Sequence, residues 1–131
     1  MRLQEKTIHA IQILRHLHKH QDMHKIASIA ESVGITAALA TRIVVRLKGV
    51  GHIVSTLEGR QKHYTLGTPA AEINIYDVVF AMEGEPCTTH HCPKIGDGCE
   101  ASEHCKTHSF LKTLQSNMVE DMLGTSIADL V

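Results

Sequence analysis

The chain has 131 residues, of which 43% are hydrophobic and 21% charged, and its formal net charge is −1. That length suits one compact domain plus an appended element. No apolar run approaches the roughly 18 residues that a membrane-spanning helix needs, and the opening residues lack the pattern of a secretory signal. We therefore expect a cytoplasmic protein that has no membrane partner.

The two halves of the sequence differ in charge. Residues 1–62 contain ten lysines and arginines against four acidic residues, whereas residues 63–131 contain three against ten. A basic half is a candidate surface for a polyanion. Aromatic residues are scarce, with two Tyr, two Phe and no Trp, so a single-strand reader built on stacked rings is disfavoured. The charge distribution therefore favours duplex DNA.

Three helices are predicted in the first 50 residues. The first spans residues 3–20, where apolar side chains recur every three positions along one face. The second covers residues 26–33 and ends at Gly34, which suits the left-handed conformation that closes a helix. The third runs from 37 to 48, after a candidate N-cap hydroxyl at Thr36. The residues expected to face the interior are Ile8, Ile11, Leu14, Leu17, Ile26, Ile29, Ala30, Val33, Leu39, Ile43 and Leu47.

The second and third helices form a candidate helix-turn-helix. A tight turn containing glycine joins them, and the third helix has an apolar inner face and a basic outer face. A plain three-helix bundle with a solvated basic face has the same pattern. Residues 52–57 and 63–66 then predict two strands around a polar turn, which together form a wing. Arg60 and Lys62 lie in that turn and suit contact with the DNA backbone or minor groove, or are solubilising charges.

The C-terminal half predicts two further helices that flank a segment without apolar periodicity. Residues 75–82 form a short helix capped by Asn74, with Val78, Val79 and Met82 facing inward. Residues 84–107 carry Gly, Pro, Cys and His and cannot build a hydrophobic core of their own. Residues 108–123 form a helix that Gly124 closes, and residues 125–131 form one more capped turn.

The predicted fold is therefore mainly α with a small β-hairpin wing. Residues 1–83 form a winged helix-turn-helix DNA-binding domain, and residues 84–107 form a cysteine-rich, cluster-binding loop. Residues 108–131 contain a dimerisation helix and the C-terminal turn. For the long helix, packing against its own domain is the alternative.

Four cysteines and a histidine lie close together in the segment that lacks a core. Their spacing is Cys87-x4-Cys92-x6-Cys99-x5-Cys105-x2-His108. Thiolates are the ligands that soft metals and iron-sulfur clusters select, and a disulfide frame is disfavoured in a cytoplasmic protein. Structural zinc sites usually contain a close pair such as C-x2-C, which is absent here. The spacing favours an iron-sulfur cluster over zinc, with redox-active or inert thiols as a third interpretation.

These features together resemble the Rrf-type family of bacterial transcription regulators, especially its IscR branch and its nitric-oxide-sensing NsrR branch. The resemblance covers nearly the whole chain, and the cysteine segment is its most specific part. The family's wing usually has a run of glycines before a Tyr, whereas this wing keeps only Gly59. The matching features are the helix-turn-helix, the wing near residue 60, Val78-Val79-x-x-Met82-Glu83, the spaced cysteines, Cys105-Lys-Thr-His108 and Ser126-Ile-Ala-Asp-Leu-Val131.

The resemblance implies a set of cluster ligands. Cys92, Cys99 and Cys105 would be ligands, with His108 as the fourth, as in the IscR branch. Relatives with an acidic residue near position 8 can use it on the partner subunit's cluster, but Ile8 stands here, which favours His108. The IscR branch holds a 2Fe-2S cluster, which is expected here, while other relatives hold 4Fe-4S. The interval before Cys99 is one residue longer than usual, so Cys87 is a substitute first ligand.

The expected function is a DNA-binding transcription regulator, a repressor, whose promoter binding responds to cluster state through redox, nitric oxide or iron supply. The alternative is a zinc-stabilised DNA-binding protein without a sensing role. No nucleophile and base pairing or phosphate loop is visible, so we do not expect an enzyme. A homodimer would place two third helices in successive major grooves of a roughly palindromic operator. The candidate DNA contacts are Ala38, Thr41, Arg42, Arg46, Lys48, Arg60 and Lys62.

The chain also contains eleven histidines. Histidine titrates near neutral pH and is common in pH sensors and haem sites. Most of these histidines lie on predicted polar faces, where a solvated role is expected. They include a group at the end of the first helix and in the turn after it, His16, His18, His20 and His24.

Overall fold

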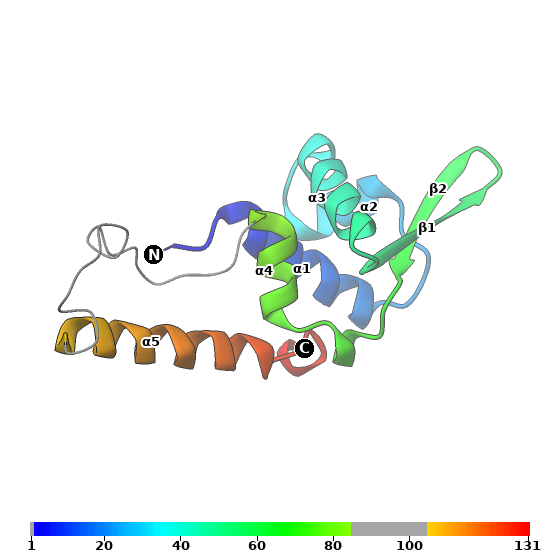
Figure 1. Ribbon diagram of the computed structural model, residues 1–131. Helices are drawn as coiled ribbons and strands as arrows, with labels where there is room; N and C mark the ends of the chain where they lie inside the picture. The colour runs from blue at the N-terminus through cyan, green and yellow to red at the C-terminus, as the bar shows by residue number, and fades with distance from the viewer. Residues whose placement is uncertain (1, 85–104) are drawn as a thin grey trace.

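The computed structural model describes residues 2–84 and 105–131. Helices surround one core, a two-stranded hairpin projects from one side, and a long helix extends away on the other (Figure 1). Two short 3-10 turns, Ala70–Glu72 and Ala128–Leu130, complete the described elements. The main elements are α1 (Glu5–Lys19), α2 (Ile26–Val33), α3 (Ala37–Gly49), β1 (Ile53–Glu58), β2 (Gln61–Leu66), α4 (Ile75–Glu83) and α5 (Lys106–Leu123).

The turn between α2 and α3 has the predicted chemistry. Gly34 ends α2 with φ 78°, a left-handed conformation that side chains disfavour, and its N–H donates to the Ala30 carbonyl. The Thr36 hydroxyl then caps α3 by accepting from the Leu39 N–H at 3.2 Å. The two helices meet at 107°, within the range of a helix-turn-helix. Both terminal signals in the sequence are confirmed.

The core lies where α1, α3 and α4 meet, and most of the predicted interior residues are buried there. The prediction for Ile8 is wrong, because this side chain is 42% exposed. Steps of three residues fall behind the 3.6-residue turn of a helix, so three such steps rotate by about half a circle. Ile8 therefore faces away from Leu17, and Ala10 and Ile13 take the buried positions instead.

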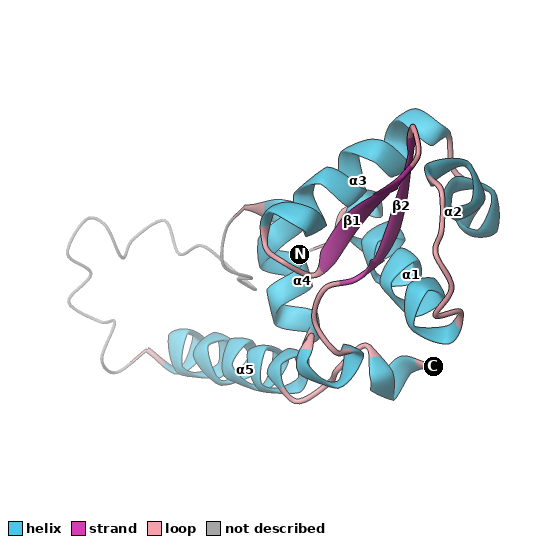
Figure 2. Ribbon diagram, turned by 90° about the vertical axis from the view of Figure 1, so that its right-hand side faces the viewer, coloured by secondary structure: helices cyan, strands magenta, loops and turns pink. Residues whose placement is uncertain are grey.

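The hairpin pairs β1 with β2 in antiparallel register, from Ile53 opposite Leu66 to Glu58 opposite Gln61 (Figure 2). Ile53 anchors its base in the core with no exposed surface. The turn between α1 and α2 pairs with β2, because the Tyr64 N–H donates to the His24 carbonyl at 2.7 Å and the reverse bond measures 3.3 Å. The wing is thus attached to the helix-turn-helix on two sides.

The C-terminal part contributes one long helix and a short turn that enters the core. Helix α5 begins at Lys106, two residues before the predicted start, and none of its residues is buried. Gly124 ends it in a right-handed conformation, φ −84°, so closure does not depend on glycine's left-handed freedom. The capped turn that follows is confirmed, because Ser126 and Asp129 exchange two hydrogen bonds. Ile127 has no exposed surface and completes the core.

Candidate nucleic-acid interface

The exposed face of α3 carries most of the predicted DNA contacts. Ala38, Thr41 and Arg42 are all exposed, as is Lys48 near the end of the helix. The Thr41 hydroxyl donates to the Ala37 carbonyl at 2.8 Å, which fixes its rotamer while leaving the oxygen free to accept. This face combines small, polar and cationic side chains, the mixture that reads base edges in a major groove.

The structure adds Val45 to this face. Its side chain is 62% exposed and lies one helical turn beyond Thr41 and Arg42. An exposed branched side chain suits apolar contact with a thymine methyl group. Sequence reasoning missed it because a valine in an amphipathic helix is normally assigned to the core.

Arg46 lies at the edge of the same face and turns towards α4. Its Nη1 donates to the Met82 carbonyl at 3.0 Å in a partly buried contact. Part of its guanidinium is therefore engaged within the protein, unlike that of Arg42, for which no hydrogen bond is found among the described residues. The structure brings Ala38, Thr41 and Arg42 together, and it places Arg46 beside them.

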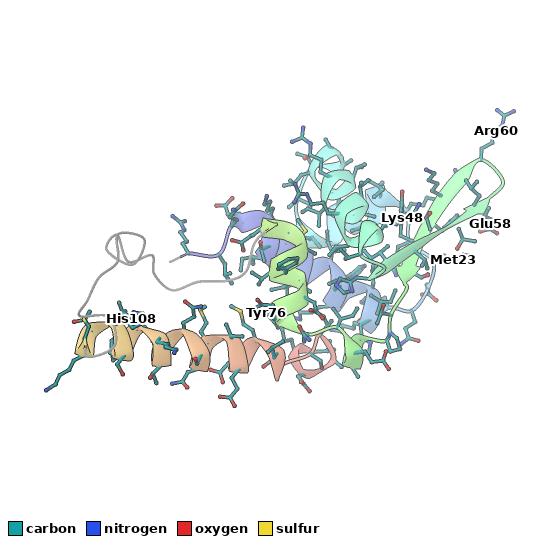
Figure 3. The ribbon with its side chains drawn as sticks, viewed as in Figure 1. Met23, Lys48, Glu58, Arg60, Tyr76 and His108 are labelled. Atoms are coloured by element: carbon teal, nitrogen blue, oxygen red, sulfur yellow. The ribbon has the colours of Figure 1, made fainter. Side chains whose placement is uncertain are left out.

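The wing presents its cations at the tip. Gly59 turns the chain, and Arg60 projects from the outer end of the hairpin while Lys48 lies nearer its base (Figure 3). Lys62 is also exposed. The His63 Nε2 also lies 3.5 Å from the Glu58 carboxylate, a contact that the sequence analysis did not predict. This pair places one acidic group on the wing beside the two cations.

The described part of the cysteine segment is the start of α5. Cys105 is the N-cap position and His108 lies in the first turn, and both side chains are half-buried although the helix has no buried residue. Their positions, three residues apart at the start of one helix, suit two ligands of a single site. The other three predicted ligands, Cys87, Cys92 and Cys99, lie outside the described residues.

A thiol and an imidazole fit the donor set of an iron-sulfur cluster or of zinc. Across residues 2–84 and 105–131, no three His, Cys, Asp or Glu side chains gather into a site that could hold a metal ion. A complete site therefore needs donors beyond Cys105 and His108.

Three of the histidines at the end of α1 and in the turn after it form a cluster that the sequence analysis did not predict. The His16 ring lies 4.9 Å from both the His20 and the His24 rings, and the His24 Nε2 lies 2.7 Å from the His20 carbonyl oxygen. Partial burial lowers the pKa of His16, and the charges of His24 and His20 lower it further. The spacing of four residues in the sequence was the signal for this cluster.

The described helices were also compared with the requirements of a membrane span. No single helix in residues 2–84 or 105–131 is long and apolar enough to cross a bilayer. Within that part of the chain, α2 and α3 taken together reach the necessary length and composition, but the chain bends by 107° between them.

Solved structures share this architecture. The oxidised form of CymR from Staphylococcus aureus superposes with a TM-score of 0.74 at 21% identity, over 99% of this chain and 95% of that one. The IscR of T. potens gives the same TM-score at 18% identity, over 99% and 85%. These likenesses establish the winged-helix fold.

Sequence comparison identifies the family. The IscR transcriptional regulator of Photorhabdus laumondii is 29% identical over 133 aligned positions, which include all of this chain and 79% of that protein. The sequence profile of the Rrf2 family, described as iron-dependent transcriptional regulators, matches residues 3–131. The chain belongs to the Rrf2 family of transcriptional regulators.

Proposed function

We propose that this protein is a homodimeric repressor that binds an operator through α3 and the wing, and whose affinity responds to the state of an iron-sulfur cluster. The observation that carries the proposal is the position of Cys105 and His108 at the start of α5, both half-buried, in a chain whose other half presents a basic winged helix. The two parts share one fold, so a change at one can reach the other.

Base reading is assigned to the exposed face of α3. Arg42 is exposed, and its guanidinium makes no hydrogen bond within residues 2–84 and 105–131, so it suits bidentate contact with guanine. Thr41 and Val45 suit neighbouring base edges. Lys48, Arg60 and Lys62 are better placed for phosphates, which fix register without reading sequence. Ala38 allows close approach of the helix to the groove because its side chain is small.

Dimerisation is assigned to α5. A helix of 18 residues with no buried side chain is unusual in a stable fold unless a partner covers it. Phe110 and Leu114 lie one helical turn apart on the same face, and they are 65% and 45% exposed. A second copy of α5 would cover this apolar face and set the distance between two α3 helices, which predicts a palindromic operator.

Sedimentation equilibrium tests this assignment with Leu114→Glu and the neighbouring, polar Thr113→Glu as its matched control. We expect the first variant to become monomeric and the second to remain dimeric. A dimeric L114E protein would contradict the use of this face.

The ligands proposed for the cluster are Cys92, Cys99 and Cys105 with His108, and Cys87 is the substitute for Cys92. When bound, a 2Fe-2S cluster would supply redox and nitric-oxide chemistry. The chain's own contribution is to hold the thiol and the imidazole on one side of α5 and to shield them partly from water. A 4Fe-4S cluster is the alternative nuclearity.

Anaerobic purification with visible spectra and iron, sulfide and zinc assays tests the cofactor. We expect a coloured protein with iron and sulfide, bleached in Cys105→Ala and altered in His108→Ala, while Ser109→Ala, an exposed neighbour on the same helix, keeps its spectrum. Colourless protein with stoichiometric zinc would instead support a structural zinc site without sensing, which the same Cys-x2-His pair suits. Equal operator affinity in gel shifts of holo and apo protein would refute the sensing role.

A further inference from the structure

The last turn of α4 is the point where three helices are tied together. It ends at Glu83, and Gly84 follows it in a left-handed conformation. In the sequence, Cys87 comes three residues after Gly84. The cysteine segment therefore begins only a few residues along the chain from this turn.

Arg46 attaches this turn to α3. Its Nη1 donates to the Met82 carbonyl at 3.0 Å. The last four carbonyls of a helix have no partner within the helix, and the helix dipole makes this end attractive to a cation. Arg46 thus caps the end of α4 from a neighbouring helix. Through this hydrogen bond, the position of the Met82 carbonyl is linked to that of α3.

Thr7 attaches the same turn to α1. Its side chain has no exposed surface, and its hydroxyl donates to the Glu83 carboxylate at 2.9 Å. The two contacts involve adjacent residues, Met82 and Glu83. A displacement of the end of α4 would therefore disturb its hydrogen bonds to α1 and α3.

We infer that Arg46 is a positioning residue that couples the cysteine segment to α3, rather than a reader of bases. This inference rests on the proposed function, because it names the route by which cluster state would reach the DNA. Packed helices move as units and not by gradual deformation, so a shift at Gly84 would carry Met82 with it. Through the Arg46 hydrogen bond, this shift would change the orientation of α3 or break the bond. In both cases the exposed face of α3 that carries Arg42 would be affected.

The test compares operator affinities of holo and apo protein in three variants. Arg46→Met keeps the aliphatic stem but has no donor, Arg46→Lys keeps a cation that can reach a carbonyl, and Arg42→Met is the matched control on the same helix. For the wild type we expect the ratio of the two affinities to lie in the usual coupling range, about 5–150-fold. We expect it to fall towards one in R46M, to survive in R46K, and to survive in R42M although both affinities drop.

The outcomes distinguish a coupling role of Arg46 from direct contact with DNA. If R46M lowers both affinities by the same factor and keeps the wild-type ratio, Arg46 reads DNA directly and the inference is overturned. If the wild type itself shows a ratio of one, the proposed function fails and the coupling fails with it.

Hydrogen exchange without DNA gives an independent readout. We expect the amides of α3 to exchange at different rates in holo and apo wild type, and at equal rates in R46M. Arg46→Gln is the second variant if R46M does not fold, because its shorter side chain stays polar. A wild-type exchange difference that persists in the folded variant would overturn the inference.

Discussion

Replacing Ile127 by alanine tests whether the C-terminal turn is part of the core. The Ile127 side chain has no exposed surface and packs with residues of α1, α3 and α4 in one cluster. Its backbone N–H donates to the Ile73 carbonyl at 2.9 Å, and the Ile75 N–H donates to the Thr125 carbonyl at 2.9 Å. Alanine keeps both backbone bonds, so the variant removes packing alone.

The expected cost follows from the buried volume. Truncating a fully buried isoleucine to alanine costs about 2–5 kcal/mol, and we expect about 3 kcal/mol here. For a protein of this size each kcal/mol lowers Tm by about 3–5 °C, so the midpoint should fall by roughly 9–15 °C. Leu130→Ala is the matched control, because that side chain is 38% exposed and its loss should cost less than about 1 kcal/mol.

Thermal and urea denaturation of the reduced apo protein, followed by circular dichroism, measures both variants. Protein concentration must be the same throughout, because the proposed dimerisation would make Tm depend on it. A Tm for I127A within about 3 °C of that for L130A would refute the reasoning, since it would mean that the turn is not packed in the core.

Three further changes have defined outcomes. Burial lowers the pKa of His52, against a smaller opposite effect of Asp77, so the free energy of unfolding should be highest above pH 6.5 and fall as pH drops below it. In His52→Leu the urea midpoint should therefore change less between pH 7.5 and 5.5 than it does in the wild type. An equal change of the midpoint in both proteins would contradict this. Thr36→Ala removes the α3 cap and should cost about 1 kcal/mol, while Thr36→Ser should restore most of it; equal urea midpoints for all three proteins would exclude a capping role. Arg60→Ala should weaken specific and non-specific DNA binding alike and reduce the salt slope by about one, whereas a loss confined to one operator base would assign Arg60 to base reading.

The local features of the fold were predictable from sequence. The Thr36 and Asn74 caps, the Gly34 turn and the hairpin depend on residues within a few positions of each other, and the structure has all of them. The inward direction of Val78, Val79 and Met82 was also predicted, because their spacing follows the helical period.

The features that the sequence did not predict depend on distant residues. Arg46 belongs to a basic helix face by its spacing, and only the approach of α4 makes Met82 its acceptor. The Thr7 contact joins residues 76 positions apart, and no periodicity marks it. The error at Ile8 has a different origin, since a stripe with a period of three cannot specify which end of it is buried.

The candidate site likewise contains residues that the sequence pattern could identify and residues that depend on tertiary structure. The exposed cations of α3 and the wing could be chosen from pattern, because a solvated face needs no tertiary partner. Val45 could not, because its exposure depends on how α3 sits on the core. The sequence spacing predicts Cys105 and His108 as ligands, and the structure places them at the N-cap and in the first turn of α5.

The burial of Ile127 also means that the core can be completed only near the end of translation. The DNA-binding elements leave the ribosome first, at roughly 5–20 residues per second, and their core keeps an unfilled space until Ile127 arrives. The whole cysteine segment lies between those elements and Ile127. A shortened product that stops within that segment would carry the DNA-binding surface on an incomplete core, and proteases remove such chains readily. The fold thus disfavours the accumulation of a DNA-binding part that lacks the cysteine segment.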